Sequence, residues 1–179
     1  CLVLIGLLVV LVGVVWSGDV SASFWSIFMG VGYLAGVVLG PFEAWFLFRA
    51  LGCLRLWVER MSQNAQTLAE TLLAHPNVEN VFYPGLPHHT GHAVAAKQML
   101  GGYGCLMSVL VKGGREEALA VVGKLKLFLR ATSLGGVESL VEHRHTIEPH
   151  TGIPENLIRV SVGIEHIDDL IADWHQALG

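Results

Sequence analysis

Apolar positions recur every three or four residues between Pro41 and His75, and this spacing predicts one long helix. Proline is tolerated in a first helical turn, and the His75-Pro76 step favours an end there. At 1.5 Å per residue the apolar stripe would be about 50 Å long. The positions that form it are Leu47, Leu51, Leu54, Val58, Met61, Ala65, Leu68 and Leu72. A coiled-coil seam would explain the stripe, but Gly52 and the aromatic residues off the stripe favour a helix that connects two domains.

After this helix, short apolar runs alternate with helical spacing, which predicts a compact α+β domain over residues 76–179. Strands are expected at 78–83, 105–112, 128–132 and 157–164, and helices at 92–100, 115–127 and 167–178. In the last strand, alternation puts Ile158 and Val160 on one face and Arg159 and Ser161 on the other. The pattern therefore predicts a four-stranded sheet with its helices on one side.

The first 40 residues differ from the rest because they are almost uncharged. Residues 1–54 contain only Asp19, Glu43 and Arg49 as charged groups, and the first 16 residues form a valine-rich apolar run. A transmembrane helix needs roughly 18–20 apolar residues, and a signal peptide needs a basic segment before its apolar run. We therefore expect residues 1–40 to be strands of a buried α/β sheet, the remnant of a larger domain. A membrane hairpin over residues 1–48 is the alternative.

Composition excludes several function classes. A net charge of −4 with 11 Lys and Arg residues gives no basic surface for nucleic acid. The three cysteines lie far apart, which argues against a disulfide framework or a zinc site and favours a reducing cytoplasm. No metal site is expected either, because the two histidine groups fall in predicted loops without nearby ligand partners. These groups are His88, His89 and His92, and His143, His145 and His150.

The candidate chemistry lies in the string S-L-G-G-V-E-S-L at Ser133–Leu140 and in Arg159 on the last strand. A glycine-bearing loop can turn backbone N–H groups and a serine hydroxyl toward an anion, and a guanidinium forms two parallel hydrogen bonds to a carboxylate. Together they predict a site for a small carboxylate. A turn-closing role for Ser133 and a surface ion pair for Arg159 are the alternatives.

Carboxylates near these strings are expected to be structural rather than catalytic. Glu138 is expected to be buried and to accept backbone hydrogen bonds. Glu165, Asp168 and Asp169 are expected to serve the first turn of the last helix, where the helix dipole stabilises negative charge.

Five strings stand out along the chain: L-G-P-F-E-A-W at Leu39–Trp45, S-Q-N-A at Ser62–Ala65, H-P-N-V-E-N-V-F-Y-P-G-L-P at His75–Pro87, S-L-G-G-V-E-S-L at Ser133–Leu140, and L-I-R-V-S-V-G-I-E-H-I-D-D-L-I-A-D at Leu157–Asp173. In this order and spacing they closely resemble the C-terminal part of the Cys/Met-metabolism family of pyridoxal-phosphate-dependent trans-sulfuration enzymes, of the cystathionine γ-synthase and γ-lyase type.

This resemblance implies a fold and a site. The fold would be the C-terminal part of a fold-type I pyridoxal-phosphate-dependent transferase: a remnant of the cofactor-binding large domain over 1–40, a long interdomain helix over 41–75 and a small α+β domain over 76–179. Arg159 and Ser133, aided by the backbone at Leu134, would hold the α-carboxylate of a sulfur amino acid. The cofactor would be pyridoxal 5'-phosphate, and the enzyme would be a cytoplasmic homo-oligomer, a tetramer as in the family.

The chain departs from the family pattern because it has no S-x-T-K string for the lysine that carries the cofactor. Its only lysines are Lys97, Lys112, Lys124 and Lys126, and the family's cofactor-binding residues would lie upstream of Cys1. We therefore expect a C-terminal fragment that keeps the substrate-carboxylate site, lacks the Schiff-base lysine, and is inactive alone. A non-catalytic module that pairs with homologues, and a membrane-anchored protein, are the alternatives.

Overall fold

The computed structural model describes residues 41–179. Its first helix, α3 (Pro41–Leu73), runs for 33 residues and confirms the long helix predicted from the apolar stripe. The stripe divides at its middle: Met61 and the three stripe positions after it are buried, whereas Leu47, Leu51, Leu54 and Val58 are exposed. The strands or membrane hairpin expected before residue 41 lie outside the described residues. The domain limits at residues 40 and 75 stay a prediction.

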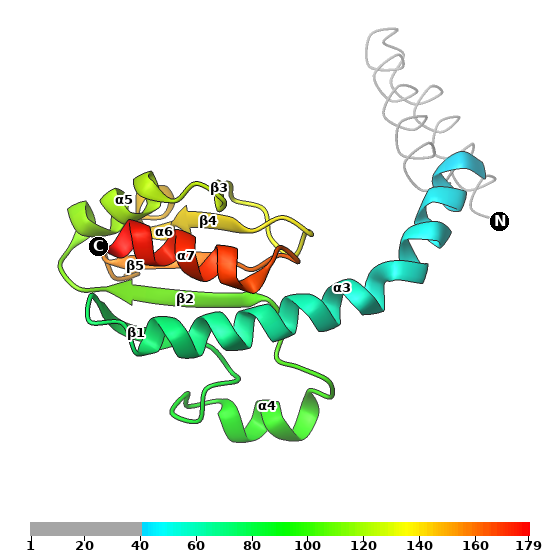
Figure 1. Ribbon diagram of the computed structural model, residues 1–179, viewed down its shortest axis with the longest axis horizontal. Helices are drawn as coiled ribbons and strands as arrows, with labels where there is room; N and C mark the ends of the chain where they lie inside the picture. Colours follow the sequence, from blue (N-terminus) through cyan, green and yellow to red (C-terminus); the bar gives the residue numbers. More distant parts are fainter. Residues whose placement is uncertain (1–40) are drawn as a thin grey trace, which may run out of the picture. The chain divides into compact units, whose positions relative to one another are not determined.

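A five-stranded sheet, in the order β1-β2-β5-β4-β3, forms the centre of the unit Cys53–Gly179 (Figure 1). The β3-β4 pair is parallel, and the other three pairs are antiparallel. The strands are β1 (Val78–Phe82), β2 (Leu106–Val111), β3 (Leu129–Arg130), β4 (Leu140–His143) and β5 (Leu157–Ser161).

The prediction of four strands is therefore wrong, because β4 was not recognised. It has only four residues, and two of them are Glu142 and His143. Neither the alternation of a half-buried strand nor an apolar run is visible, although all four residues are buried. The strand forms because β5 supplies hydrogen bonds along one edge and β3 along part of the other.

Helices follow the predicted order, with one addition. They are α4 (His92–Gln98), α5 (Arg115–Lys124), the unpredicted single turn α6 (Arg144–Ile147), and α7 (Ile167–Leu178). Helix α5 ends three residues before the predicted Leu127. The reason is that the N–H groups of Lys126 and Leu127 donate to the carboxylate of Asp173 on α7 instead of continuing the helix.

The hydrophobic core lies on one face of the sheet. Alternate strand residues such as Val109, Val141 and Val160 pack there with Leu68 of α3 and Trp174 of α7 in one buried cluster. α5 also contributes buried side chains to this cluster. Because successive side chains of a strand alternate, the residues between these positions point to the opposite face. That opposite face presents Arg159.

Candidate functional site

Arg159 sits in a row of three side chains that crosses the middle of the sheet. It is opposite Ser108 of β2 on one side and Glu142 of β4 on the other. Its Nη2 lies 2.7 Å from Oε2 of Glu142, and the side chains of Arg159 and Glu142 are 20% and 3% exposed. The strand pairing thus sets a partly accessible guanidinium against a buried carboxylate, as cross-strand neighbours of opposite charge.

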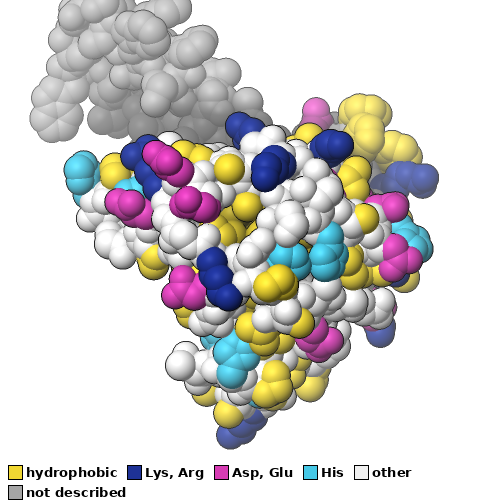
Figure 2. All heavy atoms as spheres, turned by 60° about the vertical axis from the view of Figure 1, so that its left-hand side comes forward, with side chains coloured by type: hydrophobic (Ala, Val, Ile, Leu, Met, Phe, Trp, Pro, Cys, Tyr) yellow, Lys and Arg dark blue, Asp and Glu magenta, His cyan; other side chains and the backbone are white. Residues whose placement is uncertain are grey.

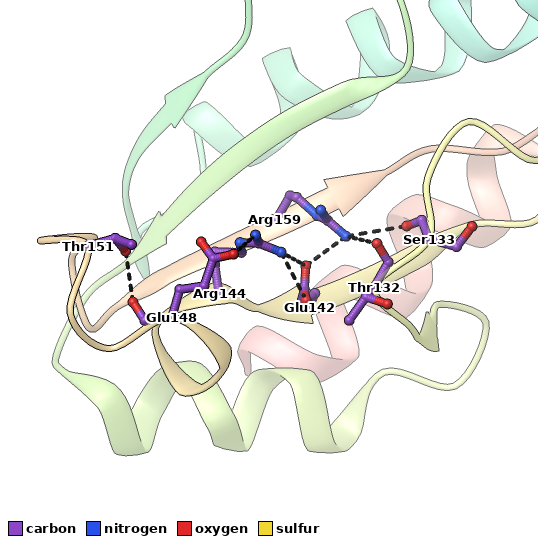
Figure 3. A network of polar contacts seen from close by, with 7 residues as sticks. All are labelled: Thr132, Ser133, Glu142, Arg144, Glu148, Thr151 and Arg159. Atoms are coloured by element: carbon purple, nitrogen blue, oxygen red, sulfur yellow. Dashed lines mark hydrogen bonds and ion pairs between the residues drawn. The ribbon is translucent and has the colours of Figure 1, made fainter. Parts of the chain in front are cut away.

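The loop after β3 supplies the remaining contacts of this guanidinium. Nη2 of Arg159 donates to the carbonyl oxygen of Thr132 at 2.6 Å and to that of Ser133 at 3.3 Å (Figure 3). The structure therefore brings Arg159 and Ser133 together, as the sequence predicts, but the contact uses the serine carbonyl. Leu134, the third predicted residue, is 50% exposed and follows directly in the loop.

The glycine-bearing loop is fastened to the end of β5. Gly135 has φ of +74°, a left-handed conformation that favours glycine, and its N–H donates to Oγ of Ser161 at 2.9 Å. Further along, Ser139 donates its N–H and its hydroxyl to the carboxylate of Glu165, each at 2.8 Å. These bonds fix the loop beside Arg159.

The structure differs from the roles expected for two glutamates. Glu138 is exposed, so the prediction that it is a buried acceptor of backbone hydrogen bonds is wrong. Glu165, which is half-buried, instead accepts the N–H and the hydroxyl of Ser139 and does not lie in the first turn of α7. Asp168 and Asp169 do lie in that first turn, as predicted.

Sequence reasoning missed two charged residues of the site, Glu142 and Arg144. Nη1 of Arg144, on α6, lies 3.3 Å from Oε2 of Glu142, and Nη2 of Arg144 also pairs with Glu148. The available signal was the string V-E-H-R, which places an acid and a base two residues apart. Their partner Arg159 is remote in the chain, however, so only the β4-β5 pairing reveals the network.

The histidines are not arranged as a metal site. Among residues 41–179, no group of three or more His, Cys, Asp or Glu side chains could hold a metal ion. His143 is buried in β4 and contacts Oγ1 of Thr146 and the carbonyl of Glu155, both at 2.6 Å. Its expected place in a solvated loop is therefore wrong.

The lysines do not fit a cofactor attached beside Arg159. A Schiff base needs a lysine next to the carboxylate anchor. Lys112 and Lys124 instead line a separate pocket with Asn77 and Glu117, and Lys97 lies in the last turn of α4. The described contacts of Arg159 are with Glu142, Thr132 and Ser133. Within residues 41–179, no described contact therefore joins a lysine to Arg159.

The surface of this unit is mixed in charge. Figure 2 shows basic and acidic side chains interspersed on the face turned toward the reader, with histidines between them. Among residues 41–179, no helix is both long enough and apolar enough to cross a bilayer.

The fold and site define a small α+β domain, preceded by a long helix, that presents an arginine on one sheet face. The family model of the Cys/Met metabolism PLP-dependent enzymes matches residues 4–179. The chain belongs to this family, whose cofactor is pyridoxal 5'-phosphate, and its fold is that of the C-terminal part of a fold-type I enzyme.

Relatives and a solved structure support the same family assignment. The chain is 47% identical over 151 residues to cystathionine gamma-synthase of Mycobacterium tuberculosis, covering 81% of this chain and 39% of that protein. It is 41% identical over 160 residues to L-methionine gamma-lyase of Fusobacterium nucleatum, covering 84% and 40%. The crystal structure of metB from Corynebacterium glutamicum superposes with a TM-score of 0.74 at 42% identity, over 89% of this chain and 42% of that one. The chain thus spans about two fifths of the length of these relatives.

Proposed function

We propose that this chain is the part of a trans-sulfuration enzyme that binds the α-carboxylate of a sulfur amino acid, with Arg159 as the anchor. The observation that carries the proposal is the position of its guanidinium. It is partly exposed on the sheet face opposite the core and lies against the Ser133 carbonyl. Family membership and the names of the relatives, which include a cystathionine gamma-synthase and a methionine gamma-lyase, support a sulfur amino acid as the ligand.

An arginine suits this role because its planar fork fixes the direction of a carboxylate as well as its position. Holding the carboxylate in one orientation determines how the bonds of the neighbouring Cα are presented for reaction. The chemistry at Cα belongs to the family's cofactor. In this proposal the 179-residue chain binds the amino acid but does not turn it over alone, because no described contact joins a lysine to Arg159. A homo-oligomeric state and a cytoplasmic location stay predictions.

The proposal is tested by titrating the 179-residue chain with L-methionine and with L-methioninol, which has the same side chain and amine but no carboxylate. We expect binding of methionine only. Arg159→Met removes a charge-assisted pair and should weaken methionine binding about tenfold or more. Arg159→Lys keeps the charge but loses the fork, so its affinity should fall between those of the wild type and Arg159→Met.

Arg115→Met is the matched control, because Arg115 is an exposed arginine at the start of α5 and is not among the described contacts of Arg159. Its affinity for methionine should equal that of the wild type in calorimetry. Equal binding of methioninol and methionine, or unchanged binding by Arg159→Met, would overturn the proposed function.

A further inference from the structure

Glu142 occupies the guanidinium of Arg159 in the way that a ligand carboxylate would. Oε2 of Glu142, the Thr132 carbonyl and the Ser133 carbonyl lie 2.7, 2.6 and 3.3 Å from Nη2 of Arg159. All three acceptors share this one nitrogen (Figure 3). Since Nη2 carries two hydrogens, its donating capacity is already filled.

This matters because both two-bond arrangements of a guanidinium with a carboxylate use Nη2. The end-on fork pairs it with Nη1, and the side-on fork pairs it with Nε. An incoming carboxylate therefore has to displace an acceptor from Nη2. Of the three acceptors, Glu142 carries the same charge as the ligand and repels it, so it is the one that competes.

Glu142 has a second cation within reach. Nη1 of Arg144 lies 3.4 Å from Oε1 and 3.3 Å from Oε2 of Glu142. The Glu142 side chain is only 3% exposed, and a buried carboxylate without a partner is strongly unfavourable. Arg144 can therefore neutralise Glu142 when Arg159 turns away from it, which lowers the cost of the exchange.

We propose that Glu142 is an internal carboxylate that holds Arg159 until a ligand carboxylate displaces it, and that Arg144 takes over the charge of Glu142 during this exchange. Glu142 and Arg144 are then positioning residues. They set how strongly a ligand carboxylate must bind to displace Glu142 from the guanidinium of Arg159. The inference rests on the proposed function of Arg159 and adds two residues that act through it.

The two positioning residues are expected to shift affinity in opposite directions. Glu142→Gln keeps the shape but removes the competing charge, so the 179-residue chain should bind L-methionine about tenfold more tightly. Arg144→Met leaves Glu142 with Arg159 as its remaining partner in the network, so binding should weaken about threefold to tenfold. In the double variant, which combines Glu142→Gln and Arg144→Met, position 142 carries no charge that an arginine at 144 would have to neutralise. The affinity should therefore match that of Glu142→Gln.

The measurement combines calorimetric titration with NMR spectra of ¹⁵N-arginine-labelled protein, in which the Arg159 guanidinium signal reports its change of partner. A purely structural role would weaken binding in both single variants, so weaker or unchanged binding by Glu142→Gln overturns the inference. If Glu142→Gln does not fold, weakened binding by Arg144→Met together with a retained Arg159–Glu142 signal supports it, and unchanged binding overturns it. Arg159→Met distinguishes failure of this inference from failure of the proposed function. Unchanged methionine binding by Arg159→Met would overturn the proposed function itself.

Discussion

His75, just after the end of α3, shows how a single ionisable residue links the structure to pH. Its ring lies 5.2 Å from that of His175 on α7. Burial, and secondly repulsion by His175, lower the pKa of His75 below its usual 6.5. The neutral ring also accepts the N–H of Asn77 on Nδ1 at 3.2 Å. The imidazole of His75 therefore binds a proton more readily in the unfolded chain than in the folded one. The stability that His75 contributes is lost as pH falls below 6.5 through the lowered pKa.

We predict that His175→Gln raises the pKa of His75 toward its usual value, although burial keeps the pKa low. The loss of stability on acidification below pH 6.5 should become shallower. An NMR titration of the imidazole signals gives the pKa, and urea unfolding at two pH values gives the stability change. His150→Gln, at an exposed histidine in a loop, is the control and should change neither quantity. A pKa of His75 that stays the same or falls in His175→Gln would contradict the prediction.

Single residues also show where sequence reasoning succeeds. The sheet face of Arg159 and its candidate role could be predicted, because both follow from residues close to it in the sequence: the alternation within its strand and the string that surrounds it. Glu142 could not, because its role comes from the register that pairs it with Arg159, 17 positions away in the chain. The backbone hydrogen bond expected at Glu138 forms at Glu165 for the same reason, because the loop at Ser139 folds back on the segment after β5.

At the scale of elements, long helices with a clear apolar stripe were predictable, and so was the strand β3, which lies within the range expected at 128–132, whereas β4 was not. β4 has four residues, so its sequence carries too few positions to show a period. Its pairing depends on contacts remote in the chain. Helix α5 shows the same limit, because its end is set by Asp173, which lies on another helix.

Asp173 provides the test at this scale. It is buried, and its carboxylate accepts the N–H groups of Lys126, Leu127 and Phe128 at distances between 2.8 and 3.4 Å. Asp173→Ala should lower the free energy of unfolding by about 2–4 kcal/mol, because it removes the acceptor of one buried and two partly buried N–H groups. Urea denaturation measures this change. Asp169→Ala, at an exposed carboxylate in the first turn of the same helix, should cost less than about 1 kcal/mol. Equal losses in the two variants would show that Asp173 does not fasten the end of α5.

At the scale of the whole chain, the family match can be set beside the position of Arg159. The core helices bury one face of the sheet, and the other face carries Arg159 with its two charged neighbours. The chain matches the family from residue 4 onward yet spans about two fifths of its relatives. The proposed carboxylate anchor is therefore a guanidinium whose described contacts include no lysine.

The four lysines provide a test of whether the chain offers an attachment site for pyridoxal phosphate. All four are exposed, so they should react with pyridoxal phosphate as independent surface amines. After incubation at equimolar cofactor and borohydride reduction, peptide mass mapping should find label spread over the four lysines, in the same proportions as in the chain unfolded in urea. The comparison with the unfolded chain removes differences that are intrinsic to each sequence position. Preferential labelling of one lysine in the folded chain alone, with a visible Schiff-base absorption band, would show that this chain holds the cofactor. For catalysis, that lysine would also have to lie near Arg159. Lys112 and Lys124 instead line a pocket with Asn77 and Glu117.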